Sequence, residues 1–198
     1  MAIYTPHDRF YRKARERGFA SRAAFKIEEL IERFKLARPG ARIVDLGCAP
    51  GGWLKILARA AGKHGAVVGV DLVECKAPGV ITIAGDIREP AVAAAIAEQL
   101  GGPADLITSD LAPKLSGIAA RDQARSRELV QAALGVAQRL LRPGGAMVAK
   151  LFMGADFEPT VAEFRRRFSS VQIARTEATR PGSSELYIVA RDFHGPRG

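Results

Sequence analysis

The sequence predicts an α/β fold in which a seven-stranded, mostly parallel sheet carries helices on both faces and ends on an antiparallel strand. Three observations predict this architecture. Seven short apolar runs recur along the chain, helical patterns separate most of them, and a glycine-rich turn follows the first run. Strands that alternate with helices are typical of parallel sheets that are buried on both faces.

The apolar runs are short enough for strands, and the intervals between them show helical periodicity. An amphipathic helix over 21–31, with Ser21 as its N-cap, precedes the first strand. The predicted strands are 41–46, 66–72, 80–83, 106–109, 146–152, 171–174 and 185–190. The later helices are 52–61, 90–100, 121–141 and 158–168, and residues 142–145 read as a helix stop and turn.

The last two strands depart from this alternation. Only residues 175–184 separate them, which is too short for a helical crossover and suits a hairpin. The final strand is therefore predicted to be antiparallel.

The turn after the first strand has the features of a ligand-binding loop. Residues 43–53 read IVDLGCAPGGW. Gly47, Gly51 and Gly52 allow positive φ angles and a close approach of the backbone, while Pro50 stiffens the turn. The next helix directs its amide groups at the same place, so the loop predicts a site for a nucleotide-like cofactor.

The neighbouring acids help to choose between a dinucleotide and S-adenosylmethionine. A dinucleotide fingerprint needs a middle glycine where this chain has Ala49. Asp71, at the end of the second strand, suits the ribose hydroxyls of either cofactor. Asp86, beside apolar Ile87, suits the amine of adenine, and Asp110 ends the fourth strand at the same edge. These acids favour S-adenosylmethionine.

The charge of the chain is concentrated at its two ends. Residues 1–42 carry 11 Lys and Arg against 5 acids and residues 164–198 carry 7 against 3, whereas the middle is nearly balanced. Basic flanks on a neutral body indicate a polyanionic partner such as RNA, although solubility or a basic proteome would give the same balance. The predicted RNA-binding residues, which alternate with aromatic ones, are Arg12, Lys13, Arg15, Arg17 and Arg22.

The length and composition predict one cytoplasmic domain, 1–198, with a basic RNA-binding extension and helix (1–40), a core (41–191) and a tail (192–198). The start is polar and basic, without a signal-peptide core, and no apolar run approaches the roughly 18 residues of a membrane span. Cys48 and Cys75 are expected to be buried thiols, and no metal site is predicted.

The motifs DLGCAPGGW, GDI, SDLAP, AKLF and SSELYIVA resemble those of the FtsJ/RrmJ family of RNA ribose 2′-O-methyltransferases, and the resemblance runs from about Ser21 to Ala190. It implies a Rossmann-like S-adenosylmethionine-dependent fold and methylation of a uridine ribose in 23S ribosomal RNA of the large (50S) subunit by a monomer, as part of ribosome biogenesis. Two positions depart from the family pattern, Cys48 in place of Ala and Lys114 in place of Asn. The implied catalytic tetrad is Lys26, Asp110, Lys150 and Glu185; the cofactor-binding positions are Gly47, Pro50, Gly51, Gly52, Trp53, Asp71, Asp86, Ile87 and Asp110.

Lys150 is the predicted proton acceptor for the ribose hydroxyl, because it lies in an apolar strand where lysine has little structural role. Burial and Lys26 favour its neutral form, while Asp110 and Glu185 favour the charged form. A charged Lys150 would instead orient the hydroxyl and stabilise the oxyanion. The alternatives are a methyltransferase for tRNA, for a small molecule or for protein, and a non-catalytic ribosome-assembly factor.

Overall fold

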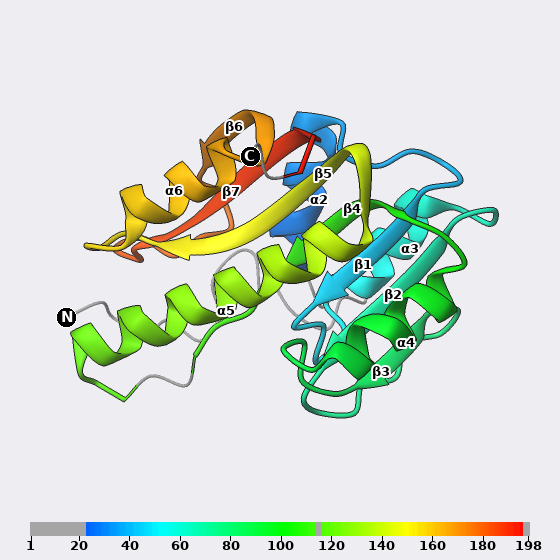
Figure 1. Cartoon of the computed structure of the whole chain (residues 1–198), viewed down its shortest axis with the longest axis horizontal. Coiled ribbons are helices and arrows are strands. Elements are labelled where there is room, and N and C mark those ends of the chain that lie inside the picture. The colour runs from blue at the N-terminus through cyan, green and yellow to red at the C-terminus, as the bar shows by residue number, and fades with distance from the viewer. Residues whose placement is uncertain (1–22, 114–115, 196–198) are drawn as a thin grey trace.

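The computed structural model describes residues 23–113 and 116–195, which form one seven-stranded sheet with helices on both faces (Figure 1). The strands are β1 (Arg42–Leu46), β2 (Ala66–Asp71), β3 (Ile81–Ala84), β4 (Ala104–Ser109), β5 (Leu141–Phe152), β6 (Phe168–Ala174) and β7 (Glu185–Phe193). The helices are α2 (Ala23–Phe34), α3 (Leu54–Ala61), α4 (Pro90–Leu100), α5 (Ala119–Leu140) and α6 (Phe157–Arg165).

The strand order is β3-β2-β1-β4-β5-β7-β6, and β7 runs antiparallel to both of its neighbours. The pairings among β1 to β5 are parallel. The predicted architecture, including the antiparallel last strand, is confirmed. The order reverses between β1 and β4, so the carboxyl ends of these strands form the edge where ligands of open α/β sheets bind.

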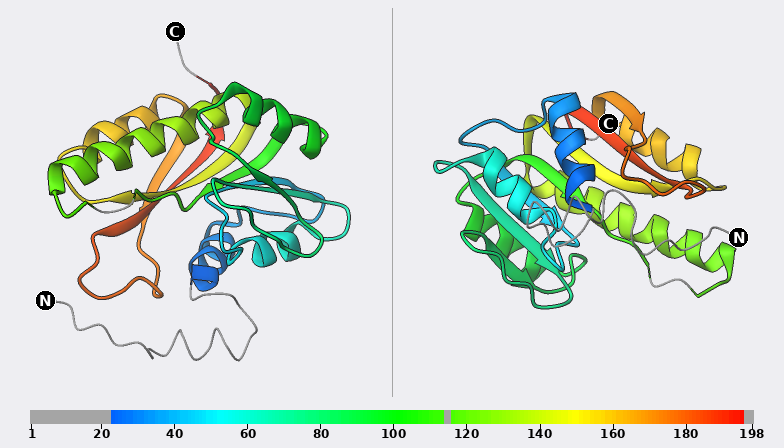
Figure 2. Two further views of the ribbon diagram at one scale, coloured as in Figure 1. Left: turned by 90° about the horizontal axis from the view of Figure 1, so that it is seen from below. Right: turned by 180° about the vertical axis from the view of Figure 1, so that it is seen from behind.

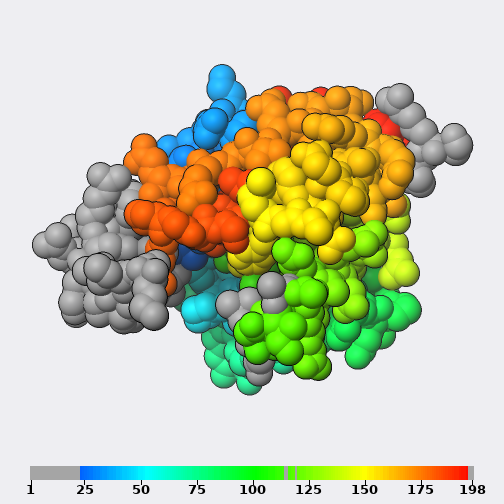
Figure 3. Space-filling model, turned by 90° about the vertical axis from the view of Figure 1, so that its left-hand side faces the viewer, coloured from blue at the N-terminus to red at the C-terminus, as the bar shows by residue number. Residues whose placement is uncertain are grey.

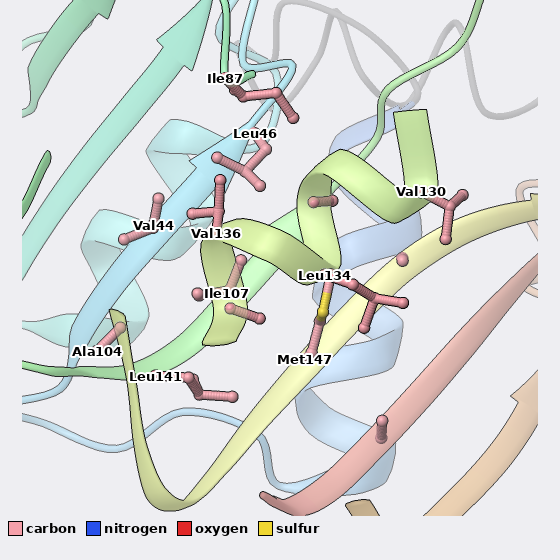
Figure 4. Packing of buried hydrophobic residues seen from close by; sticks show 14 of the residues in the cluster. Val44, Leu46, Ile87, Ala104, Ile107, Val130, Leu134, Val136, Leu141 and Met147 are labelled. Carbon is pink, nitrogen blue, oxygen red and sulfur yellow. The ribbon is translucent and has the colours of Figure 1, made fainter. Parts of the chain in front are cut away.

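The two faces of the sheet carry separate hydrophobic cores. Helices α2 and α3 cover one face, and α4, α5 and α6 cover the other, as the left view of Figure 2 shows. Figure 4 shows the second core, in which side chains of β1, β4 and β5 meet α5. Its labelled residues include Val44, Leu46, Ile107, Met147, Val130 and Leu134. None of the helices in the described ranges is long and apolar enough to cross a membrane.

Several element boundaries differ from the prediction. Strand β5 begins at Leu141, directly after α5, and includes the residues predicted to be a turn. The turn exists within the strand as an irregularity: Ala104 pairs with Leu141 and Leu106 with Ala146, and Gly144 has a φ of 72°. Helix α6 ends at Arg165 because Phe168 already belongs to β6. Ser21, the predicted N-cap, lies outside the described residues.

Candidate active site

The glycine-rich turn after β1 packs so tightly that Gly47 has no room for a side chain. Its φ is 81°, and a Cβ there would lie 2.9 Å from Leu111 Cδ2. Gly51 also has a positive φ, of 96°. Gly52 does not, so the prediction of a positive φ at Gly52 was wrong. The chain at Gly52 is already turning into α3. The turn is anchored to β2, because the amides of Gly47 and Cys48 donate to the Val70 carbonyl at 2.8 and 3.1 Å.

An open cavity lies at the carboxyl edge beside this turn. It is lined by Gly47, Ala49, Asp71, Arg88, Asp110 and Leu111, among others. The Asp71 carboxylate accepts hydrogen bonds from the amides of Ala49 at 3.0 Å and Val73 at 3.1 Å, which fix its orientation. Each carboxylate oxygen has a second lone pair, so Asp71 can still accept from a ligand.

Asp86 lies after β3 and is held by Arg88, whose side chain lines the cavity. The Arg88 Nε lies 2.9 and 3.0 Å from the two carboxylate oxygens of Asp86. The hydrogen bonds from Arg88 lower the pKa of Asp86 to about 2, so Asp86 is an ionised acceptor. Ile87 is buried in the core on the α4–α5 face.

The other predicted cofactor residues of the loop, Pro50 to Trp53, are not among the residues that line the cavity. Trp53 is buried, and its indole Nε1 donates to the Ala23 carbonyl at 2.8 Å, which links the start of α3 to the start of α2. Pro50 follows a cis peptide bond. The structure thus brings Gly47, Asp71 and Asp110 to the cavity wall, and the cofactor roles of the remaining positions stay predictions.

Two lysine–carboxylate pairs lie at this edge, and each joins residues from distant parts of the chain. Lys26 Nζ lies 2.6 Å from Glu185 Oε1, and Lys150 Nζ lies 3.1 Å from Asp110 Oδ1. Lys150 also donates to the Asp110 carbonyl at 2.7 Å. Both lysines are buried, with 7% and 8% of their surface exposed. Buried lysines are rare unless they are paired, and each of these two is paired with a carboxylate. The four predicted catalytic positions therefore form a polar cluster at this edge.

The fold explains this convergence. Lys26 is in the first turns of α2, Asp110 follows the end of β4, Lys150 is in β5 and Glu185 begins β7. The antiparallel register places Glu185 opposite Phe152 and Tyr187 opposite Lys150. Figure 3 looks onto this edge, where the connection from β6 to β7 (orange to red) lies beside the end of β5 (yellow).

Tyr187 also belongs to this cluster, and sequence reasoning missed it. Its hydroxyl donates to Asp110 Oδ1 at 3.0 Å, and its ring centroid lies 5.8 Å from Lys26 Nζ and 5.9 Å from the Trp53 ring. Burial, then the Asp110 charge, raises the pKa of Tyr187, so it remains a hydrogen-bond donor. Alternation along β7 was the available signal, because Tyr187 shares a face with Glu185.

The connection between β6 and β7 supports Glu185 from the other side. The Thr179 hydroxyl donates to Glu185 Oε1 at 3.2 Å and lies 3.0 Å from the Thr176 hydroxyl. Burial alone would raise the pKa of Glu185, but the hydrogen bond and charge of Lys26, together with Lys150 and Thr179, lower it overall. Glu185 is therefore an ionised anchor for Lys26.

Asp45 lies beneath the turn at the end of β1 and is 1% exposed. The Thr108 hydroxyl donates to its Oδ1 at 2.7 Å, while its Oδ2 has no hydrogen-bond partner within the described part of the chain. Burial, with smaller effects of Asp110 and Asp71, raises the pKa of Asp45 to about 7. Cys48 and Cys75 are buried free thiols, as predicted.

The predicted RNA-binding residues Arg12, Lys13, Arg15, Arg17 and Arg22 lie outside the described residues, as does Lys114. Within the described residues, no group of three or more His, Cys, Asp or Glu side chains has the arrangement of a metal site. Within the described residues, the candidate site therefore consists of the cavity and the cluster around Lys26 and Lys150.

Comparison with known proteins gives one matching family and several similar structures. The family model described as FtsJ-like methyltransferase matches residues 19–193. A protein of Myxococcus xanthus named ribosomal RNA large subunit methyltransferase E is 45% identical, over 98% of this chain and 92% of its own length. One with the same name from Methanothrix thermoacetophila is 45% identical, over 93% of this chain and 72% of its own.

Two solved structures resemble the fold. A ribosomal RNA methyltransferase from Plasmodium falciparum has a TM-score of 0.79 and 26% identity, with 89% of this chain and all of that one covered. Fibrillarin of Aeropyrum pernix, solved with bound S-adenosyl-L-methionine, has a TM-score of 0.57 and 19% identity and covers 85% of this chain and 73% of its own. The fibrillarin likeness concerns the fold alone.

Proposed function

Because the chain belongs to the FtsJ-like methyltransferase family, we propose that it transfers the methyl group of S-adenosylmethionine to the 2′-hydroxyl of a uridine ribose in 23S ribosomal RNA. The observation that carries this proposal is the pairing of Lys26 with Glu185 and of Lys150 with Asp110 beside the cavity. The names of its relatives support large-subunit ribosomal RNA as the substrate.

The residues around the cavity fit this cofactor. Asp71 would accept from the ribose hydroxyls, and Asp86, ionised beside Arg88, would accept from the adenine amine. Gly47 lines the cavity without a side chain, so a ligand can approach its backbone, and we assign the rest of the loop, Pro50 to Trp53, to shaping this wall. Ile87 supports the wall from the core. When bound, S-adenosylmethionine supplies a methyl group already activated by its positively charged sulfur.

The acceptor is the difficult partner, because a ribose hydroxyl is a weak nucleophile at neutral pH. In the proposed mechanism, Lys150 accepts the hydroxyl proton as the new carbon–oxygen bond forms. Asp110 orients Lys150 through contacts of 3.1 and 2.7 Å.

Lys26 has a different part in this mechanism. It is held by Glu185 at 2.6 Å and is directed by it toward the same edge of the sheet. There its ammonium group stabilises negative charge that develops on the acceptor oxygen. The two lysines therefore divide the work, with Lys150 removing the proton and Lys26 stabilising the oxyanion.

We further propose that the chain acts as a single-domain cytoplasmic monomer, and that its substrate is the RNA within the large (50S) subunit. The basic extension over 1–40 would hold this RNA through Arg12, Lys13, Arg15, Arg17 and Arg22. Helix α2, within this segment, begins one residue after Arg22 and carries Lys26, which would couple RNA binding to the chemistry.

A transfer assay with labelled cofactor tests this function on large subunits, naked 23S RNA, tRNA and a protein mixture. The proposal expects label in the ribosomal RNA, and label confined to tRNA or to protein would contradict it. Lys150→Ala and Lys150→Met should both abolish transfer while calorimetry shows unchanged cofactor affinity. Lys76→Ala, an exposed lysine away from the cluster, is the control. An active Lys150 variant would remove Lys150 from the mechanism.

A further inference from the structure

A second basic surface lies at the opposite edge of the sheet, where the amino ends of the parallel strands meet. The C-terminal end of α2, the start of β5 and the end of β7 come together there, at the top of Figure 1. They line two adjoining depressions, which share Lys35 and Arg191. We call this region the amino-edge surface.

The amino-edge surface has a clear excess of positive charge. Its basic side chains are Arg33, Lys35, Arg38, Arg142 and Arg191, and its acidic ones are Asp105 and Asp192. Asp105 is already engaged by Arg142 at 2.7 Å and by Arg38 at 3.7 Å. Within the described residues, Arg33, Lys35 and Arg191 form no ion pair. Three cations therefore remain for an external anion.

The arginines of this surface are partly fixed in place. The Arg33 guanidinium lies 5.0 Å from the Phe34 ring centroid, and Arg142 is held by Asp105 and by the Pro143 carbonyl. Arg191 donates to the Ser170 hydroxyl at 3.4 Å, and its Nε is shielded without a partner in the described part of the chain. Planar guanidinium groups that are held in this way are well suited to phosphate.

Lys35 gives a second, independent indication. It occupies the left-handed region with a φ of 52°, just after α2, where the Leu36 amide donates to the Ile31 carbonyl. Glycine is the usual residue in this helix-ending motif, because a side chain is strained there. The chain has a lysine at this position, and its side chain lies in the middle of the amino-edge surface.

We infer that the amino-edge surface binds backbone phosphates of the RNA substrate at a place remote from the acceptor nucleotide; this inference rests on the proposed function. Lys35 is nine residues beyond Lys26, which is about 14 Å along the axis of α2. The surface is thus too far away to contact the acceptor ribose. Helix α2 connects the two places, with Lys26 near one end and Arg33 and Lys35 at the other.

RNA fits this surface better than a lipid or an apolar partner does. The large hydrophobic side chains that the described residues expose are Leu72, Val73, Ile81, Ile118, Met153 and Ile173. None of them lines either depression, whereas membrane-binding helices bury an apolar face and the core of a protein interface is enriched in aromatic residues and methionine. Arginine supplies most of the charge, as in many phosphate-binding surfaces.

The test measures how binding of a 23S RNA transcript depends on salt, for the wild type and for Arg33→Gln/Lys35→Gln. Each lost phosphate contact reduces the slope of log affinity against log salt by about 0.7 to 0.9, so the double variant should lose about 1.5. Its cofactor affinity should not change. Lys76→Gln/Arg166→Gln removes the same charge from exposed positions outside the surface and should bind like the wild type.

Lys35→Gly separates binding from folding. It removes the strain, so its thermal stability should match or exceed that of the wild type while its RNA affinity falls. A wild-type slope in both Arg33→Gln/Lys35→Gln and Lys35→Gly would overturn the inference and leave the proposed function intact. A wild type that neither binds nor methylates the transcript or the large subunit would overturn both. The inference would also be contradicted if Arg33→Gln/Lys35→Gln kept wild-type RNA binding but no longer bound an acidic protein that the wild type binds at this surface.

Discussion

Asp45 should make the protein less stable as pH rises, and Asp45→Asn should remove this dependence. The folded pKa is about 7 against an ordinary 3.8. Between these values the unfolded chain releases the Asp45 proton and the folded chain retains it, so unfolding becomes more favourable as pH rises. The shift corresponds to a total change of about 4 kcal/mol in the free energy of unfolding, because one pKa unit is about 1.36 kcal/mol. Most of this, about 3 kcal/mol, falls between pH 5 and 8.

Urea denaturation at pH 5, 6, 7 and 8 measures this effect for the wild type and Asp45→Asn. The asparagine keeps an oxygen for the Thr108 hydroxyl, so the main change is the loss of the titrating group. The unfolding free energy of the variant minus that of the wild type should rise by about 3 kcal/mol from pH 5 to pH 8. Glu98→Gln, at an exposed position of α4, should give a flat difference. A flat difference for Asp45→Asn as well would refute the reasoning.

Three further changes test the loop, the support of the cluster and the basic extension. Gly47→Ala should abolish cofactor binding in calorimetry, because its Cβ would meet Leu111 at 2.9 Å. Gly79 has a similar φ of 73° but lies in open space, so Gly79→Ala should bind the cofactor normally. Thr179→Val should lower the transfer rate about tenfold, since a hydrogen bond to a charged group contributes about 1.5 kcal/mol, while Thr179→Ser keeps the rate. Equal rates for Val and Ser would show that the hydroxyl is not needed. Changing four basic residues to Ala should flatten the salt dependence of RNA binding, and an unchanged slope would exclude the extension as the docking segment. These residues are Arg12, Lys13, Arg15 and Arg17.

The alternation of strands with helices and the antiparallel β7 were predictable from local patterns. The ten residues over 175–184 were too few for a helical crossover, and this alone indicated a hairpin. The boundary between α5 and β5 was not predictable in the same way. A helix stop such as residues 142–145 normally ends pairing, but here it is accommodated as an irregularity opposite Asp105, which holds Arg142.

The candidate site shows the same division between local and long-range information. The acids at the strand ends were found from their spacing, because parallel strands bring their carboxyl ends together. The membership of Lys26 and Glu185, 159 residues apart, in one site came from the family resemblance and not from any local pattern, and only the structure shows that they pair. Tyr187 and Thr179 were missed because their roles depend on hydrogen bonds to Asp110 and Glu185 that only the folded chain reveals.

The most direct test of the central claim is mass-spectrometric mapping of 2′-O-methyl nucleotides in large-subunit ribosomal RNA, from cells with and without this protein. The account predicts that one methylated uridine disappears without the protein and returns with the wild type. It should not return with Lys150→Met. An unchanged methylation map, or full restoration by Lys150→Met, would contradict the account.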